Sequence, residues 1–300
     1  MTHRFETTSQ EPVKDPMLSH AAAIADAATQ LKPLSHSTSQ LIAMNASPNV
    51  STTDLVNVIV HDQVLAATLL REANSAASAA SDSISTVDAA LVRLGTSRVL
   101  SVAIRLSLSG QMAAAVPQYR LSEGQLALLS VTGSLAAEVV RERSKVSLPP
   151  ELSTAALLRD IGVLVMASFL DAPHLLLLDV VKDAGTPLSE SERMVLDANH
   201  GEAGGLLCQQ WKLPESVRIG VQYHHDPVAC DEPVAHGVFL ADTVAHLVAL
   251  RTGGGWSHST PDPSTIATSA AALGIDADAL DAMADVVIAR FGDRNTGLTL

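Results

Sequence analysis

The sequence has 300 residues, of which 47% are apolar and only 3% aromatic. This length allows one large or two modest domains with a buried core. The apolar residues are mainly Ala, Leu and Val, which favour packed helices over a β-sandwich. The formal charge of -13, from 19 basic and 32 acidic residues without a basic run, argues against nucleic-acid binding.

The cysteines and the N-terminus predict a cytoplasmic protein. Cys208 and Cys230 are the only cysteines and form no CxxC motif, which is typical of reduced thiols. Residues 1–15 are polar and lack the apolar centre of a signal peptide. Because no uncharged apolar run reaches about 18 residues, we expect no membrane contact.

The N-terminal half reads as helical after a polar start. Residues 1–16 are rich in Thr, Ser, Gln, Glu and Pro and are predicted to be disordered. From Met17 onwards helices are expected, including one that begins with a capping box at Ser51–Asp54. We predict a helical unit over 17–116, closed by Pro117.

The second half, residues 120–250, continues the helical pattern, and residues 251–300 form a loop and a helical tail. Alternating strand patterns are nearly absent, so the sequence predicts an all-α fold. Gly253–Gly255 lacks the Lys-Ser/Thr of a phosphate loop and is interpreted as a flexible linker. The expected helices lie near 122–143, 151–170, 174–184, 189–211, 214–225 and 233–250, with the tail helix from Asp276 to about Phe291.

A series of motifs follows in fixed order over about residues 30 to 250. The motifs are Lys32–Leu34, His61–Leu65, Leu69–Ala76, Ser83–Ala90, Leu157–Val165, Asn199–Gly204, Trp211–Pro214 and Tyr223–Pro227. In this order they resemble an HDOD domain. The resemblance implies an HD-like helical domain preceded by an N-terminal helical subdomain, in a family of degenerate relatives of metal-dependent HD phosphohydrolases. Such domains are generally linked to bacterial signalling.

The resemblance also shows what the metal site lacks. In the HD family a His-Asp pair of metal ligands precedes Ile-Gly, but here the pair is Arg159-Asp160. A guanidinium stays protonated and has no lone pair for a metal. The early histidine should fall near Leu129-Ser130, where no imidazole is present. We therefore expect no catalytic residue and no cofactor or metal; the residual candidate metal ligands are Asp160, His200, His224 and Asp242.

Two interpretations of Arg159 stay open. In the first, Arg159 forms an internal ion pair with Asp160, where a metal once neutralised the carboxylate. In the second, Arg159 binds a phosphate or nucleotide in the old cleft. The residues that would line such a ligand cleft are Arg159, Asp160, His200, His224, His225 and Asp242.

The remaining histidines and Cys208 are interpreted structurally. On a continuous helix, His224 and His225 would point about 100° apart, so we expect one ring inside and one in solvent. A metal site of His200, His224 and Asp160 stays an alternative. The glycines after His200 predict close helix packing, Asp62 of the His61-Asp62 pair is expected to cap a helix, and Cys208 is expected in the core.

Three functions are compatible with this sequence. The first is a non-enzymatic bacterial signal-transduction module that acts through protein–protein contacts. The second is a residual metal-dependent phosphohydrolase acting on a nucleotide or cyclic dinucleotide, and the third is a pseudo-enzyme that senses such a ligand without hydrolysing it. We favour the first function. It predicts protein partners, no binding of nucleic acid or membrane, and is compatible with a homodimer.

Overall fold

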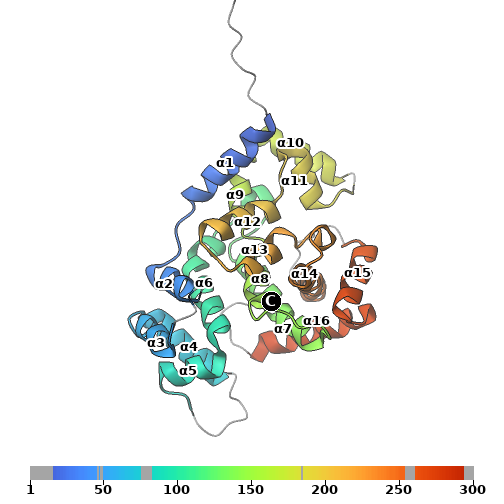
Figure 1. Ribbon diagram of the computed structural model, residues 1–300. Coiled ribbons are helices and arrows are strands. Elements are labelled where there is room, and N and C mark those ends of the chain that lie inside the picture. Colours follow the sequence, from blue (N-terminus) through green and yellow to red (C-terminus); the bar gives the residue numbers. More distant parts are fainter. Residues whose placement is uncertain are drawn as a thin grey trace, which may run out of the picture.

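The computed structural model describes residues 16–45, 47, 50–75, 83–183, 185–253 and 261–293. Within these ranges the chain folds into α-helices and short 3-10 helices, and its β-structure is an isolated bridge between Val116 and Leu121. Figure 1 shows the helices packed directly on one another. The predicted all-α fold class is therefore confirmed.

The helices of the first half are α1 (Pro16–Gln30), α2 (His36–Asn45), α3 (Thr52–Val60), α4 (Gln63–Ser75), α5 (Val87–Leu94) and α6 (Thr96–Ala113). The 3-10 helix η1 (Pro117–Tyr119) follows. The second half holds α7 (Gln125–Arg143), α8 (Leu152–Leu158), α9 (Val163–Met166), η2 (Ala167–Phe169), α10 (Ala172–Asp183), α11 (Leu188–Leu196), α12 (His200–Gln210), α13 (Glu215–Gln222), η3 (Pro227–Ala229) and α14 (Pro233–Thr252). The C-terminal part holds α15 (Pro263–Leu273), η4 (Ala277–Ala279) and α16 (Leu280–Asp293).

The first half divides between two parts of the molecule. Helices α2 to α6 pack against one another, whereas α1 packs against α9 and α12 of the second half (Figure 1). Among the described side chains of α1, Ile24 and Ala28 are buried. Two predicted helix starts are confirmed: Ser51 and Asp54 form a capping box, and Asp62 Oδ1 accepts the backbone N–H of Leu65 at 3.0 Å.

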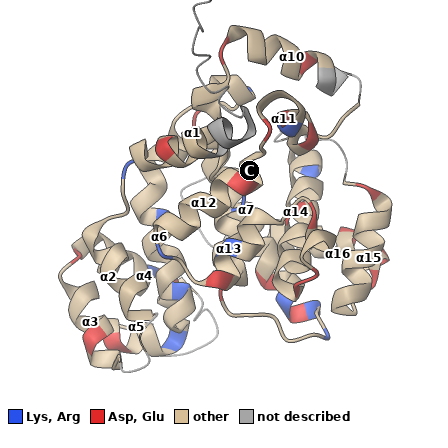
Figure 2. Ribbon diagram, turned by 45° about the horizontal axis from the view of Figure 1, so that its top comes forward, with Lys and Arg blue, Asp and Glu red and all other residues tan. Residues whose placement is uncertain are grey.

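The second half is built around α7, which packs against α8, α14 and α16. Helix α16 buries Met283, Val287 and Phe291, so the C-terminal helix is part of the core. Arg98 of α6 joins the two halves: it contacts Glu72 of α4 in the first half at 2.9 Å and Glu138 of α7 in the second half at 2.8 Å. Figure 2 shows acidic and basic positions interspersed along the helices.

The predicted helix over 151–170 is wrong, because the chain turns in its middle. Helix α8 ends at Leu158, and residues 159–162 form successive turns before α9 begins at Val163. Backbone bonds between residues three apart, such as Ile161 N–H to Leu158 O at 2.9 Å, tighten this segment. The turn faces the beginning of α12, and this contact builds the site described below.

The predicted helix over 189–211 is also two helices. Asp197 adopts a left-handed conformation with φ 54°, which ends α11. Asn199 then begins α12 with a capping box, in which its side chain accepts the Glu202 N–H and the Glu202 carboxylate accepts the Asn199 N–H. The predicted close packing after His200 is confirmed, because a Cβ at Gly204 would lie 2.7 Å from Val221 of α13.

Helix α15 was not predicted, although its signals are present in the sequence. Asp262 caps the helix by accepting the Thr265 N–H at 3.1 Å, and Pro263 occupies the first turn. Gly274 ends the helix with φ 62°. Residues 1–15 of the predicted disordered segment lie outside the described residues, and Pro16 begins α1. Residues 254–255 of the predicted linker also lie outside them.

Among the described residues, two stretches would be long and apolar enough to cross a membrane by length and composition alone. They are Leu152–Phe169 and Pro233–Thr252, with mean hydropathy 1.5 and 1.4. They are 78% and 72% buried inside the protein. Burial of this kind is what the core helices of a packed domain show.

Candidate functional site

The site forms where the turn after α8 meets the beginning of α12. Gly162 makes this approach possible, because a Cβ at that position would lie 1.9 Å from the His200 carbonyl oxygen. The close approach places the Arg159-Asp160 pair beside the first residue of α12. The side chain of Asp242, from α14, reaches the same place.

The predicted ion pair between Arg159 and Asp160 is present. Arg159 Nη2 lies 3.2 Å from Asp160 Oδ2, a charge contact whose angle is not that of a hydrogen bond. Arg159 Nε donates to Asp242 Oδ1 at 2.5 Å. Burial by itself lowers the pKa of the Arg159 guanidinium, but Asp160 and Asp242 outweigh it, and the pKa is raised. Arg159 is thus a fixed cation between two carboxylates.

Helix α7 is shaped to receive this guanidinium. Arg159 Nη1 donates to the backbone oxygens of Leu129 and Ala156, at 3.2 and 2.9 Å. Gly133 lies beside it, and a Cβ there would be only 2.0 Å from Nη1. Because only 2% of Arg159 is exposed, the interior of the protein accounts for nearly all of its surroundings.

Tyr119 and Glu192 hold His200 from the other side. Glu192 Oε2 accepts from both the backbone N–H and Nδ1 of His200, at 2.9 and 2.7 Å, and Oε1 accepts from the Tyr119 hydroxyl at 2.6 Å. Burial by itself lowers the pKa of His200, but the negative charges of Glu192, Asp160 and Asp242 outweigh burial. The pKa of His200 is therefore raised overall. Burial, then the neighbouring Glu192 charge, raises the pKa of Tyr119 well above its ordinary value.

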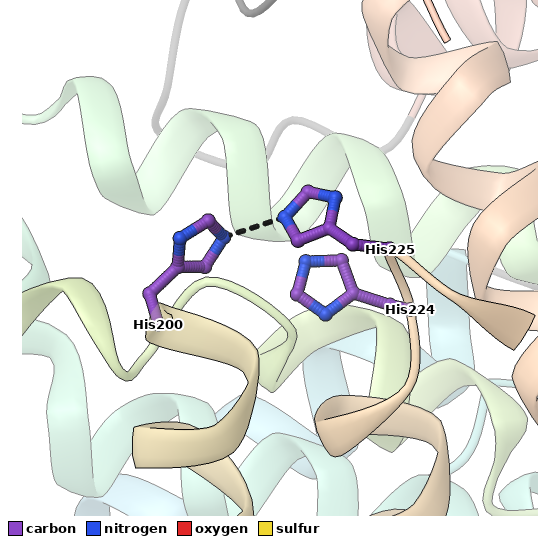
Figure 3. Close-up of side chains that lie close together, drawn as sticks. All are labelled: His200, His224 and His225. Atoms are coloured by element: carbon purple, nitrogen blue, oxygen red, sulfur yellow. Dashed lines mark hydrogen bonds between the residues drawn. The ribbon is translucent and has the colours of Figure 1, made fainter. Parts of the chain in front are cut away.

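The expectation that His224 and His225 point apart is wrong. Helix α13 ends at Gln222, so both histidines lie in the turn that follows and not on a helix. Their ring centroids are 3.9 Å apart, and both rings face His200 (Figure 3). His224 is fully buried, and burial, followed by the neighbouring His200, lowers its pKa.

The residues present do not fit the hydrolytic metal of the HD family. Leu129 contributes only its backbone oxygen, and that oxygen accepts from Arg159. Arg159 itself stands where the family's histidine ligand would be. Asp160 and Asp242 are the two carboxylates that the resemblance predicted to remain from that site, and both contact the guanidinium. We derive no catalytic step through such a metal.

A small cavity of about 390 Å³ opens beside this arrangement. Its lining includes Arg159, His225, Asp242 and His246, together with Arg193 of α11. Of the six residues predicted to line a ligand cleft, Asp160, His200 and His224 lie behind this wall with at most 2% exposure. All six nevertheless belong to one continuous network.

Other polar groups have structural roles. The Cys208 thiol is buried in the core as expected, and burial raises its pKa to about 12. Ser269, His236 and Asp231 form a serine–histidine–aspartate chain, with distances of 3.0 and 3.3 Å. Because Ser269 is fully buried, this chain joins α15 to α14 and offers no nucleophile.

Sequence reasoning missed Tyr119, Gly133 and Glu192. Gly133 carries a usable signal, because a glycine inside a helical pattern usually has a packing reason. Glu192 and Tyr119 carry none, since they meet across 73 residues of chain.

Residues 31–227 match the HDOD domain family. An uncharacterised protein of Treponema pallidum (strain Nichols) is 23% identical over 206 residues, which are 69% of this chain and 40% of that protein. The chain therefore spans less than half of that relative's length.

Solved structures show the same fold. An HDOD domain protein of unknown function from Geobacter sulfurreducens has a TM-score of 0.67 at 19% identity, covering 93% of this chain and all of its own. A "putative phosphohydrolase" from Shewanella amazonensis SB2B has 0.66 at 21%, covering 91% and 96%. A "putative signal transduction protein" from Marinobacter aquaeolei VT8 has 0.61 at 21%, covering 93% and 65%. At these identities the likeness shows the fold alone.

Proposed function

Because this chain belongs to the HDOD family, we propose that it is a non-catalytic regulatory module of bacterial signal transduction that acts through contacts with other proteins. One observation carries the proposal: Arg159 is buried between Asp160 and Asp242, the two carboxylates retained from an HD metal centre. A hydrolytic metal needs these oxygens as ligands, and a permanently charged guanidinium already neutralises them.

The proposal places the partner surface on the α2–α6 part, where three valines are exposed. Val60, Val64 and Val92, on α3, α4 and α5, are 47%, 65% and 75% exposed. The net charge of -13 favours a protein partner over nucleic acid. The proposal accordingly places the module in the cytoplasm, without nucleic acid or membrane contacts, and allows a homodimer.

The catalytic part of the proposal is tested by a turnover assay. Full-length protein would be incubated with phosphodiester, nucleotide and cyclic dinucleotide substrates in the presence of Mg²⁺, Mn²⁺ or Fe²⁺, and no product is expected. Reproducible turnover that Asp160→Ala abolishes would overturn the proposal in favour of a residual phosphohydrolase.

The contact part is tested by comparing matched surface variants. Val64→Asp is expected to abolish co-purification of a native partner that wild type retains. Val228→Asp is the control, because Val228 is 52% exposed but lies on η3 in the other half. If both variants lose the partner equally, or if both retain it, the partner surface does not lie on α2–α6.

The second candidate function is a sensor that binds a nucleotide without hydrolysing it. It is favoured by the cavity of about 390 Å³, which has the arginines Arg159 and Arg193 in its lining. A thermal-shift titration with nucleotides up to millimolar concentration tests it, since ligand that binds the folded state raises the melting temperature by mass action. Binding that persists in Arg159→Ala would exclude Arg159 as the anion clamp.

A further inference from the structure

The three histidines of the site converge from two segments of the chain. His200 begins α12, while His224 and His225 follow α13 (Figure 3). One ring nitrogen from each lies within 4.8 Å of the other two. The rings of His200 and His224 have their centroids 5.4 Å apart, and those of His200 and His225 are 4.6 Å apart.

Hydrogen bonds at the far side of two rings set the tautomers that a metal requires. His224 Nδ1 lies 2.7 Å from the Val221 carbonyl oxygen, which can only accept, so Nδ1 carries the proton. His200 Nδ1 likewise donates to the Glu192 carboxylate. Metal-bound histidines almost always donate their second ring N–H to a carboxylate or carbonyl in this way. Each Nε2 can therefore direct a lone pair into the cluster.

His224 Nε2 is the strongest sign of a missing ligand. This atom is buried and has no hydrogen-bond partner in the described structure. Because His224 is fully buried, bulk solvent does not reach the atom either. Its nearest carboxylate oxygen, Asp160 Oδ1, lies 3.8 Å away, beyond hydrogen-bond distance. A buried polar atom left without a partner costs free energy, so such atoms normally have one.

The distances suit one ion at the centre of the cluster. His225 Nε2 and His200 Nε2 lie 2.7 Å apart, a contact that needs one proton between two nitrogens. An ion with bonds of about 2.0–2.1 Å would hold the nitrogens roughly 3.4 Å apart in a tetrahedron. The rings therefore need to move by about 1 Å or less at this contact. Asp160 Oδ1 lies 3.6 Å from His200 Nε2 and is placed as a fourth donor.

The charges around the cluster also favour a cation. Asp160, Asp242 and Glu192 contribute three carboxylates, whereas Arg159 is the cation that contacts two of them. A divalent ion would balance the remaining two negative charges. Imidazole donors select Zn²⁺ and neighbouring transition metals over Mg²⁺ or Ca²⁺.

We propose that His200, His224 and His225 bind one divalent transition-metal ion of the Zn²⁺ type through Nε2, next to the place that Arg159 fills. In this arrangement the guanidinium neutralises Asp242 and lies beside Oδ2 of Asp160. The ion lies on the other side of Asp160, where Oδ1 faces His200 and His224. The inference is separate from the loss of hydrolysis, because metal binding and turnover are measured independently.

Cobalt titration of the full-length, untagged protein after removal of metal by a chelator tests the site. We expect a visible absorption band typical of a four-coordinate Co²⁺ site, saturation at one equivalent, and loss of the band when one equivalent of Zn²⁺ is added. His224→Ala and His225→Ala should weaken Co²⁺ binding at least 100-fold. His225→Gln serves as the variant that keeps the fold, since His225 is only half-buried.

Two further variants distinguish the histidine cluster from metal bound elsewhere on the protein. Glu192→Gln should weaken binding about 10- to 100-fold, as expected for the partner of a ligand. His246→Ala should bind like wild type, because His246 lines the neighbouring cavity but lies outside the cluster. No band in wild type, or equal losses in His246→Ala and His224→Ala, would overturn the proposal.

Discussion

Gly133→Ala offers a direct test of how Arg159 is held. The new Cβ would lie 2.0 Å from Arg159 Nη1, whereas ordinary contact begins near 3.4 Å, so the guanidinium must move by about 1.4 Å. Movement of this size breaks its contacts with Asp242 and with the backbone oxygens of Leu129 and Ala156. A side chain's flexible end usually moves at little cost, but this one is buried and ion-paired.

The magnitude follows from two opposing effects. Loss of one partner from a buried ion pair costs about 3–5 kcal/mol, while replacement of glycine by alanine in a helix gains up to about 1 kcal/mol. We expect the free energy of unfolding, measured by urea denaturation, to fall by about 2–4 kcal/mol. Gly110→Ala in α6 is the control: nothing lies within 4 Å of its Cβ, and a gain of about 0.5–1 kcal/mol is expected.

A double-mutant cycle decides whether Arg159 is the cause. Arg159→Met removes the guanidinium with which the new Cβ would clash. In this background, Gly133→Ala should therefore lower the free energy of unfolding much less. The reasoning is refuted if Gly133→Ala costs the same in both backgrounds, or if it stabilises the protein as Gly110→Ala does.

Three further predictions concern the same core. Arg159→Met alone should lower the free energy of unfolding by about 3–5 kcal/mol, because Asp160 is left as an uncompensated buried charge; a loss below about 1 kcal/mol in urea denaturation would show that the pair is solvated. Gly162→Ala should be more damaging than Gly133→Ala, since its Cβ meets a backbone oxygen at 1.9 Å that cannot rotate away; equal melting temperatures would contradict this. Burial raises the pKa of Cys208 to about 12 from 9.0, so its contribution to stability is complete below pH 9 and is lost as pH rises towards 12. Between about pH 9 and 11, wild type should lose up to about 2–3 kcal/mol more than Cys208→Ala, and parallel pH profiles would refute the assignment.

The helices and their order could be predicted because they depend on local patterns. The periodic small and aliphatic residues define the helix faces, and the caps at Ser51 and Asp62 follow from side chains close in sequence. The break at Asp197 was missed, although the Asn199–Glu202 capping box marks it. The apolar residues continue through this segment with helical spacing. One long helix and two successive helices give similar apolar patterns, so the pattern did not predict the break.

The convergence of His224 and His225 was missed for a different reason. The angle expected between His224 and His225 assumed that the helix continued, but it ends at Gln222, and the next residues turn. The positions of Tyr119 and Glu192 relative to His200 depend on the packing of η1, α11 and α12, which one sequence does not reveal. The sequence therefore identified Arg159, the two aspartates and the three histidines, but neither their supporting residues nor the atoms that meet.

The guanidinium and the histidines contact different sides of the acidic centre. Arg159 neutralises Asp242 and contacts the Oδ2 side of Asp160, while Oδ1 faces the Nε2 atoms of His200 and His224. The guanidinium is held by backbone oxygens and Gly133, so it cannot move towards the histidines without losing those contacts. The histidine side consequently keeps its own donors, its own hydrogen-bonded supports and an unsatisfied nitrogen. The proposed absence of hydrolysis at the arginine side and the proposed ion at the histidine side are thus compatible within one domain.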